Sequence, residues 1–239
     1  MKKLVDKMNS FAINITKPLS EEVYTLFLDT LDEDMQQKIL RYKRKSDRDL
    51  KLSTHVLLRV MLHKLYRMKF EEMYYKTNQF GKPFLPGSSI HFNLSHSGSW
   101  GVCVIDQTPI GVDIEEIVPI DINGMSAFFS KKEQSLLLQT PEKEKIDLFY
   151  RLWTLKESYL KKLGLGLSKS IDSFTFHISS ELIKVEDKHK HLYDQPHFFY
   201  EEQIEKPYKL TICAQHEKFP KETTVISVNY LYQYLVNLK

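Results

Sequence analysis

The sequence predicts an α+β fold built from two similar halves that meet near residue 110. The first observation is the order of the periodic segments: helical spacing over 20–68, β-like alternation over 90–117, helical spacing again over 124–162, and short β-like runs after 172. The second is length, because 239 residues can bury one large core or two small ones. The third is composition, since 42% hydrophobic and 27% charged residues are typical of a folded chain and argue against disorder.

Two helices are expected near the start of the chain. Ser20 caps the first, which has an acidic first turn and runs to about Tyr42 with apolar residues on one face. The second runs from Asp47 to Met68 and buries a leucine-rich stripe. A turn-rich loop over 78–87, NQFGKPFLPG, follows this helical region.

From Ile90 the pattern changes to alternation rich in Val and Ile. Strands are expected within 91–105 and 110–117, separated by the turn DQTP. Helices follow at about 124–138 and 145–162. The last β-like runs read SFTFHI, HFFYEE, YKLTICA and TVISVNYLY.

The charge balance and the cysteines limit the possible classes of protein. The net charge is only +3, from 34 Lys and Arg against 31 Asp and Glu, which argues against a dedicated nucleic-acid binder. A basic run over 38–51 keeps RNA binding as an alternative, although the aromatic residues do not form an RNA-recognition pattern. Cys103 and Cys213 are too few to staple the fold and are expected to be reduced core thiols. The sequence contains no run of 18 apolar residues, so no membrane span is predicted, and no secretory signal is visible.

The segment GVDIEEI, at 111–117, brings two carboxylates together. Side chains two apart on a strand share a face, so Asp113 and Glu115 are expected side by side. Because Gly111, Val112 and Ile114 imply that the strand is otherwise buried, a nearby cation is expected to balance the charge of the two carboxylates. The alternative is a strand end that enters solvent.

A helix within 148–168 adds a third carboxylate. Trp153, Glu157 and Lys161 are four residues apart and therefore share one helical face. A surface ion pair between Glu157 and Lys161 is the alternative, but the tryptophan favours a partly buried face. Together with the two strand carboxylates, Glu157 would complete a set of hard oxygen donors of the kind that suits Mg2+.

The segment HFNLSHSGSW, at 91–100, offers groups suited to phosphate oxygens: Ser95, His96, Ser97 and Gly98. Neighbours on a strand face opposite sides, so Ser95 and His96 cannot form a nucleophile–base couple by themselves, which argues against a hydrolase triad. The predicted chemistry is therefore metal-assisted transfer at a phosphate centre.

These motifs resemble those of the 4'-phosphopantetheinyl transferases, most closely the surfactin-synthetase-activating class. The paired signatures of the family, G-[IV]-D-[IV]-E and W-[ST]-x-K-E-[SA]-x-x-K, stand at 111–115 and 153–161. FGKP at 80–83, FNLSHSG at 92–98 and FFS at 128–130 also match. The resemblance covers nearly the whole chain and implies a pseudo-dimer of two α+β halves, with coenzyme A bound in the cleft between them.

The resemblance implies a Mg2+-dependent transfer of 4'-phosphopantetheine from coenzyme A to a carrier-protein serine, with release of 3',5'-ADP. Residues 1–110 would form the coenzyme A-binding half, and 111–239 the metal-binding, catalytic half. Glu157, or a water that it holds, is the implied base, and Lys161 would stabilise the diphosphate and the leaving group. The implied metal ligands are Asp113, Glu115 and Glu157. The implied coenzyme A contacts are Lys38, Lys45, Lys82, Ser95, His96 and Lys161.

The chain departs from the family pattern in the basic run. Leu50 stands where the family tends to have Arg and Lys51 where it has a small hydroxyl residue, so Arg48 or Lys51 would take over the 3'-phosphate. The expected protein is a cytoplasmic monomer that serves apo carrier domains of nonribosomal peptide, polyketide or fatty-acid synthases, without nucleic acid or membrane. The alternative is a non-catalytic coenzyme A or nucleotide-binding module. Three late histidines are expected in a solvated loop rather than in a metal site: His189, His191 and His197.

Overall fold

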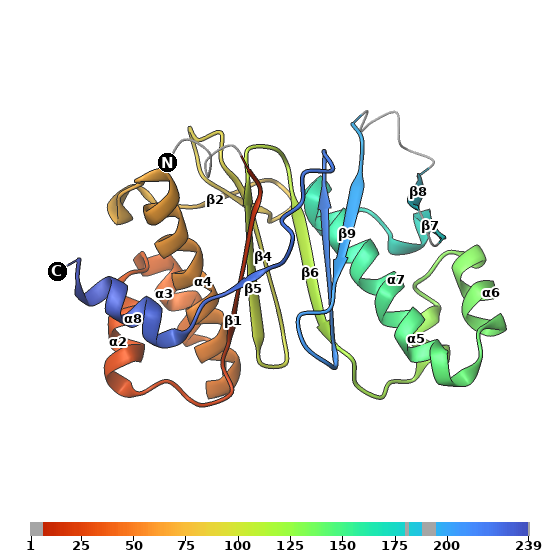
Figure 1. Cartoon of the computed structure of the whole chain (residues 1–239), viewed down its shortest axis with the longest axis horizontal. Coiled ribbons are helices and arrows are strands. Elements are labelled where there is room, and N and C mark those ends of the chain that lie inside the picture. Colours follow the sequence, from red (N-terminus) through yellow and green to blue (C-terminus); the bar gives the residue numbers. More distant parts are fainter. Residues whose placement is uncertain (1–6, 180–181, 188–194, 239) are drawn as a thin grey trace.

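The structure, a computed structural model, describes residues 7–179, 182–187 and 195–238. Two sheets lie next to each other in the middle of the molecule, with helices on both outer sides (Figure 1). The first sheet has the order β11 (Thr224–Val225), β1 (Asn9–Asn14), β5 (Trp100–Asp106) and β4 (His91–Ser97). The second has the order β6 (Gly111–Glu116), β10 (Tyr208–Ala214) and β9 (Phe198–Glu202). The predicted α+β class with two halves is confirmed.

The N-terminal helices cover the outer face of the first sheet. They are α2 (Glu21–Asp29), α3 (Glu33–Leu40) and α4 (Lys45–Tyr66). The prediction of one helix over 20–42 is wrong, because the Asp32 side chain accepts a hydrogen bond from the Met35 N–H at 2.9 Å and starts a new helix. Ser20 caps α2, as predicted.

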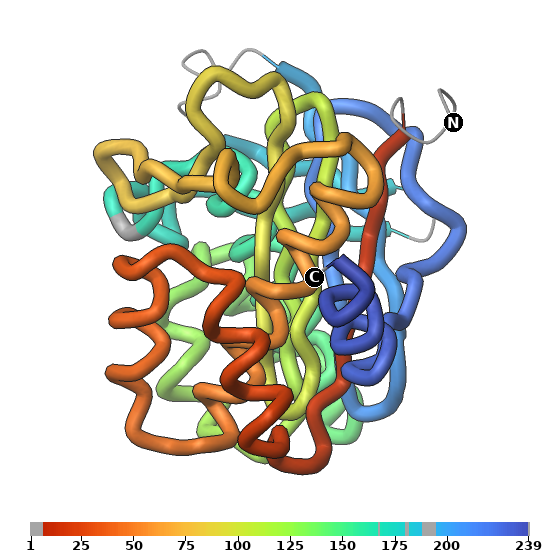
Figure 2. Tube along the Cα trace, turned by 90° about the vertical axis from the view of Figure 1, so that its left-hand side faces the viewer, coloured from red at the N-terminus to blue at the C-terminus, as the bar shows by residue number. Residues whose placement is uncertain are grey.

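The prediction that TVISVNYLY is a strand is wrong for most of its length. Only Thr224–Val225 pair with β1, in parallel, and Ser227 then caps the helix α8 (Val228–Val236). Leu231 and Leu235, one turn apart, are buried in the core of the first half. In Figure 2, α8 lies beside the N-terminal helices, and its contacts with α2 and α4 agree with this view. The chain therefore returns to the first half after residue 223, whereas all of 111–239 was expected in the second half.

In the second half, α7 (Glu142–Leu163) covers the outer face of the sheet. The single helix expected at 124–138 is divided into α5 (Ile122–Ser126) and α6 (Lys131–Gln139), because Ser130 and Glu133 form a capping box that starts α6. Two further strand pairs are β2 (Lys76–Thr77) with β3 (Pro83–Phe84), and β7 (Phe174–Ile178) with β8 (Ile183–Asp187). The 3-10 turns are η1 (Phe70–Glu72), η2 (Gly166–Ser168) and η3 (Ile171–Ser173).

Three hydrophobic cores separate these layers, so each sheet is buried on both faces. In β5, Cys103 and Ile105 face the N-terminal helices, whereas Val102 and Val104 face the second sheet. Cys213 of β10 faces the α7 side. Both cysteines are free and buried, as predicted. Across the described ranges, no helix is long and apolar enough to cross a membrane.

Candidate active site

The two sheets meet at the strands β4 and β6, which are joined by side chains rather than by a backbone ladder. Three alternate residues of β4 accept hydrogen bonds from three alternate backbone N–H groups of β6. Asn93 Oδ1 accepts from the Val112 N–H at 2.8 Å, and Ser95 Oγ accepts from the Ile114 N–H at 3.2 Å. Ser97 Oγ accepts from the Glu116 N–H at 3.0 Å. We call Asn93, Ser95 and Ser97 the polar zipper. It holds the carboxylate-bearing strand against the first half.

Asp113 lies at the centre of the site. Its Oδ1 accepts hydrogen bonds from Ser95 Oγ at 3.0 Å and from the ammonium of Lys161 at 2.6 Å. Lys161 Nζ also donates to Ser95 Oγ at 3.0 Å, so the three side chains form a closed triangle across both halves. Burial raises the pKa of Asp113, and the charge of Lys161 opposes this rise.

The other two carboxylates are electrostatic neighbours of Asp113. Ser97 donates to Glu115 Oε2 at 2.8 Å. Burial and the charge of Asp113 raise the pKa of Glu115 to about 7. The same two causes raise the pKa of Glu157. The predicted shared faces of the strand and of the helix are therefore both present, because the helical triplet projects toward the two strand carboxylates.

The three carboxylates supply the type of oxygen donor that a divalent cation prefers. Within the described ranges, no three acidic, histidine or cysteine side chains converge closely enough to form a ready metal site. One oxygen, Asp113 Oδ2, is nevertheless buried with no hydrogen-bond partner among the described residues. A partly buried set of carboxylates with raised pKa values is short of positive charge, and hard oxygen donors suit Mg2+. The residues therefore fit a divalent cation in number and chemistry.

A cationic group lies on the other side of the triangle. The Lys51 ammonium is 2.5 Å from His96 Nε2. Burial and the charge of Lys161 lower the pKa of Lys51. Burial, then the charges of Lys51 and Lys161, lower the pKa of His96 to about 4, so His96 is neutral near pH 7. The positive charges of Lys51 and Lys161 repel each other, and a bound anion would reduce this repulsion.

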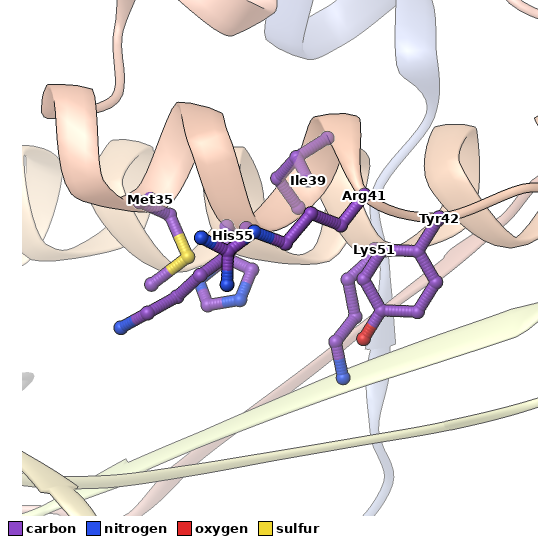
Figure 3. A pocket seen from close by; sticks show the side chains of 7 residues that line it. Met35, Ile39, Arg41, Tyr42, Lys51 and His55 are labelled. Atoms are coloured by element: carbon purple, nitrogen blue, oxygen red, sulfur yellow. The ribbon is translucent and has the colours of Figure 1, made fainter.

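Lys51 also lines a cavity of about 420 Å³ between α3 and α4. Lys38 and Arg41 line the same cavity, and Figure 3 shows Lys51 and Tyr42 projecting side by side on one part of its wall. His55 lines it too, with its pKa lowered to about 3 by burial and then by neighbouring cations. Apart from these groups its wall is apolar: Met35 and Ile39.

A second cavity, of about 310 Å³, lies between the two halves. Glu157 and Lys161 line it from α7, and Lys82 lines it from the FGKP loop. The Lys82 ammonium donates to the carbonyl oxygens of Ile110 at 2.9 Å and Lys162 at 3.2 Å. Burial lowers the pKa of Lys82 to about 8. The second cavity therefore adjoins the cluster around Asp113, and Lys51 links the first cavity to His96, the neighbour of Ser95.

Most of the predicted site residues come together. Lys45 does not line either cavity: its ammonium is 3.1 Å from the buried carboxylate of Asp49 and lies over the Tyr24 ring. Arg48 also lies over Tyr24, 5.4 Å from the ring centre. His189 and His191 lie outside the described residues, whereas His197 is described and its Nδ1 is 2.7 Å from the Lys162 ammonium.

Sequence reasoning missed the structural role of Asn93 and Ser97. The available signal was the period-two placement of polar residues at 93, 95 and 97, which marks one polar strand face. The pattern could not predict that this face contacts β6, an edge strand of the other sheet. It also missed His55, because a histidine in a leucine-rich helix gave no signal of its own.

Comparison with known proteins agrees with this geometry. A family model described as 4'-phosphopantetheinyl transferase superfamily matches residues 109–213, and one described as 4'-phosphopantetheinyl transferase, N-terminal, matches residues 17–108. The chain is therefore similar to this family on both sides of the junction between its halves.

Full-length relatives give the same result. The 4'-phosphopantetheinyl transferase Sfp of Bacillus subtilis (strain 168) is 34% identical over 94% of this chain and 100% of its own length. The 4'-phosphopantetheinyl transferase gsp of Aneurinibacillus migulanus is 30% identical over 84% of each chain. The chain belongs to the 4'-phosphopantetheinyl transferase superfamily, a family of transferase enzymes.

Proposed function

We propose that the protein transfers 4'-phosphopantetheine from coenzyme A to a serine hydroxyl of apo carrier domains and releases 3',5'-ADP. The carriers would be peptidyl or acyl carrier domains of nonribosomal peptide, polyketide or fatty-acid synthases. The observation that carries this proposal is the triangle of Ser95, Asp113 and Lys161, which places a carboxylate cluster directly beside a cationic cluster. A diphosphate with a bound cation needs both.

The cationic side suits the phosphates of coenzyme A. Lys38 and Lys51 are the groups we assign to the 3'-phosphate, because both line the cavity between α3 and α4. Arg48, the other substitute considered for the missing arginine at Leu50, lies over Tyr24 instead. Lys51 therefore supplies the charge that Leu50 lacks. Neutral His96 is a hydrogen-bonding partner for a phosphate oxygen.

The carboxylate side would hold Mg2+ through Asp113, Glu115 and Glu157. When bound, the ion would neutralise charge on the diphosphate oxygens. The protein groups around it would keep their own tasks. Ser97 orients Glu115, and Ser95 orients Asp113. The Lys161 ammonium, already at this carboxylate, would stabilise the negative charge of the departing 3',5'-ADP phosphate.

In the transfer, the serine oxygen would bond to the phosphorus that carries pantetheine, while the bond from this phosphorus to the oxygen of 3',5'-ADP breaks. The serine proton would pass to a Glu157 carboxylate oxygen, either directly or through a water. Burial and the Asp113 charge raise the pKa of Glu157, which makes it a better proton acceptor than an exposed carboxylate. Residues 95, 113 and 161 all come from one chain, which supports a monomeric enzyme.

The test is incubation of the protein with coenzyme A, Mg2+ and a panel of apo carrier domains, followed by mass spectrometry of each carrier. A gain equal to the mass of phosphopantetheine on the carrier serine, with 3',5'-ADP formed in equal amount, is expected. No gain on any carrier would refute the transfer. Coenzyme A binding without transfer would indicate the non-catalytic module instead.

Two variants test the metal and base assignments. Glu157→Gln and Asp113→Ala should abolish transfer while the protein stays folded, since each removes a carboxylate of the cluster. Glu116→Gln is the matched control, because Glu116 lies on the same strand but on the opposite face and should keep activity. Full activity in Glu157→Gln or Asp113→Ala would reject the assigned roles.

A further inference from the structure

The hairpin of β2 and β3 crosses from the first half to the C-terminal end of α7. Asn78 lies in the turn between β2 and β3, and its Nδ2 donates a hydrogen bond to the carbonyl oxygen of Gly164 at 2.7 Å. The other side-chain atom, Oδ1, accepts from the backbone N–H groups of Phe80 and Lys82, both at 2.9 Å. One amide therefore shapes the turn with its oxygen and ties the turn to the second half with its nitrogen.

The two halves are in close contact around this tie. Gly164 is the residue that ends α7 and has a φ of 70°. A Cβ there would lie 3.2 Å from Asn78 Nδ2 and 2.9 Å from the Lys82 side chain. At Gly166, a Cβ would lie 2.8 Å from the carbonyl oxygen of Phe80. There is no room for a side chain between the hairpin and the end of α7.

This contact forms one end of the cavity between the halves. Phe80 and Lys82 line the cavity from the hairpin, and Gly164 lines it from the end of α7. Glu157 and Lys161 line it from the same helix, about two turns and one turn before Gly164. The distance between the hairpin and the helix end therefore determines the width of the cavity.

We propose that Asn78 is a positioning residue that sets the width of this cavity and thereby the affinity for coenzyme A, without taking part in the transfer step. The inference rests on the proposed function. Its physical basis is that the hairpin is short, Phe80 in its turn is 39% exposed, and the side chains of Asn78 and Lys82 hydrogen-bond to the end of α7. A ligand that bridges both walls binds more tightly when they are already held in place.

Asn78→Asp and Asn78→Ala test the inference. The aspartate keeps the acceptor oxygen of the turn but loses the donor to Gly164, while the alanine loses both without adding charge. We expect the coenzyme A Kd, measured by titration calorimetry, and the KM for coenzyme A to rise about fivefold in both variants. The kcat at saturating coenzyme A and the KM for the carrier should stay within about twofold of wild type. Gln79→Ala, at the exposed neighbouring position in the turn, is the matched control and should change neither value.

Gly164→Ala perturbs the same contact from the other side and should also raise the coenzyme A Kd. Combined with Asn78→Ala, its effect should be less than additive, because both changes open one contact. The inference is overturned if both Asn78 variants keep the wild-type Kd, or if kcat falls while the KM for coenzyme A stays constant. A wild-type protein that neither binds coenzyme A nor modifies a carrier would instead refute the proposed function.

Discussion

Lys156 lies in the signature helix next to Glu157, yet its role is to stabilise the fold. Its side chain is 0% exposed, and its ammonium is 2.8 Å from a Glu133 carboxylate that is 1% exposed. The ammonium also donates to the carbonyl oxygens of Ile171 at 2.8 Å and Phe174 at 2.7 Å. This one group connects α7 to α6, to η3 and to the start of β7. We predict that Lys156→Met destabilises the protein strongly and leaves the chemistry intact.

The expected loss follows from the burial of the pair. Removing one partner of a buried ion pair costs about 3 to 5 kcal/mol, because the other charge stays buried without compensation. Glu133 would keep hydrogen bonds from Ser130 Oγ at 2.7 Å and from the Phe176 N–H at 2.8 Å, which places the loss near the lower end of this range. For a chain of this size, a loss of about 3 kcal/mol lowers Tm by roughly 6 to 12 °C.

Urea and thermal unfolding would measure this loss. Lys132→Met is the matched control, because Lys132 pairs with Glu186 at 2.7 Å on the surface, with both side chains more than half exposed. It should cost less than about 1 kcal/mol. The double variant Lys156→Met with Glu133→Gln should recover part of the stability, since it removes the unpaired charge. A loss below about 1 kcal/mol in Lys156→Met, or a large fall in kcat at a temperature where it is folded, would refute this reasoning.

Three further predictions concern Lys161, Gly111 and His55. Lys161→Ala should lower transfer at least about a hundredfold in a carrier-loading assay, because it removes the cation that faces Asp113 and the leaving group. Gly111→Ala should lower both Tm and activity, since its Cβ would lie 2.0 Å from the Ser158 carbonyl oxygen and push α7 from the sheet; unchanged thermal unfolding would contradict this. Burial lowers the pKa of His55 from 6.5 to about 3, so the folded protein binds this proton at a lower pH than the unfolded chain does. The contribution of the neutral His55 to stability is therefore complete above pH 6.5 and is lost as the pH falls toward 3. His55→Leu should therefore flatten the fall in urea midpoint between pH 7 and pH 4, and an unchanged slope would contradict the assigned pKa.

Local patterns predicted most elements of the fold but not where the chain pairs. The spacing of apolar residues marked α4 and α7 well, because long amphipathic helices repeat their signal over several turns. It missed the division at Asp32, where a cap interrupts an otherwise continuous pattern. It also favoured a strand over 224–232, because Val, Ile and Tyr prefer strands, whereas burial of Leu231 and Leu235 against the first half favours a helix.

The site was predictable where its residues are close in sequence. Asp113 and Glu115 share a strand face, and Glu157 and Lys161 share a helix face, so their spacing predicted which of them are neighbours but left a solvent-exposed strand end and a surface ion pair as alternatives. The contact between Lys161 and Ser95 depends on the packing of two halves, which no local period encodes. The structure adds that the ammonium of Lys45, an expected coenzyme A contact, pairs with Asp49 one turn away.

The return of the chain to its first half has a consequence for synthesis on the ribosome. The N-terminal helices and most of the first sheet are made early, but their core includes Leu231 and Leu235, which are translated after the whole second sheet. The core between α7 and the second sheet uses residues only as far as Cys213. The half that is encoded second can therefore complete its helix-side core while the half encoded first still lacks α8, so the first half completes its core after the second.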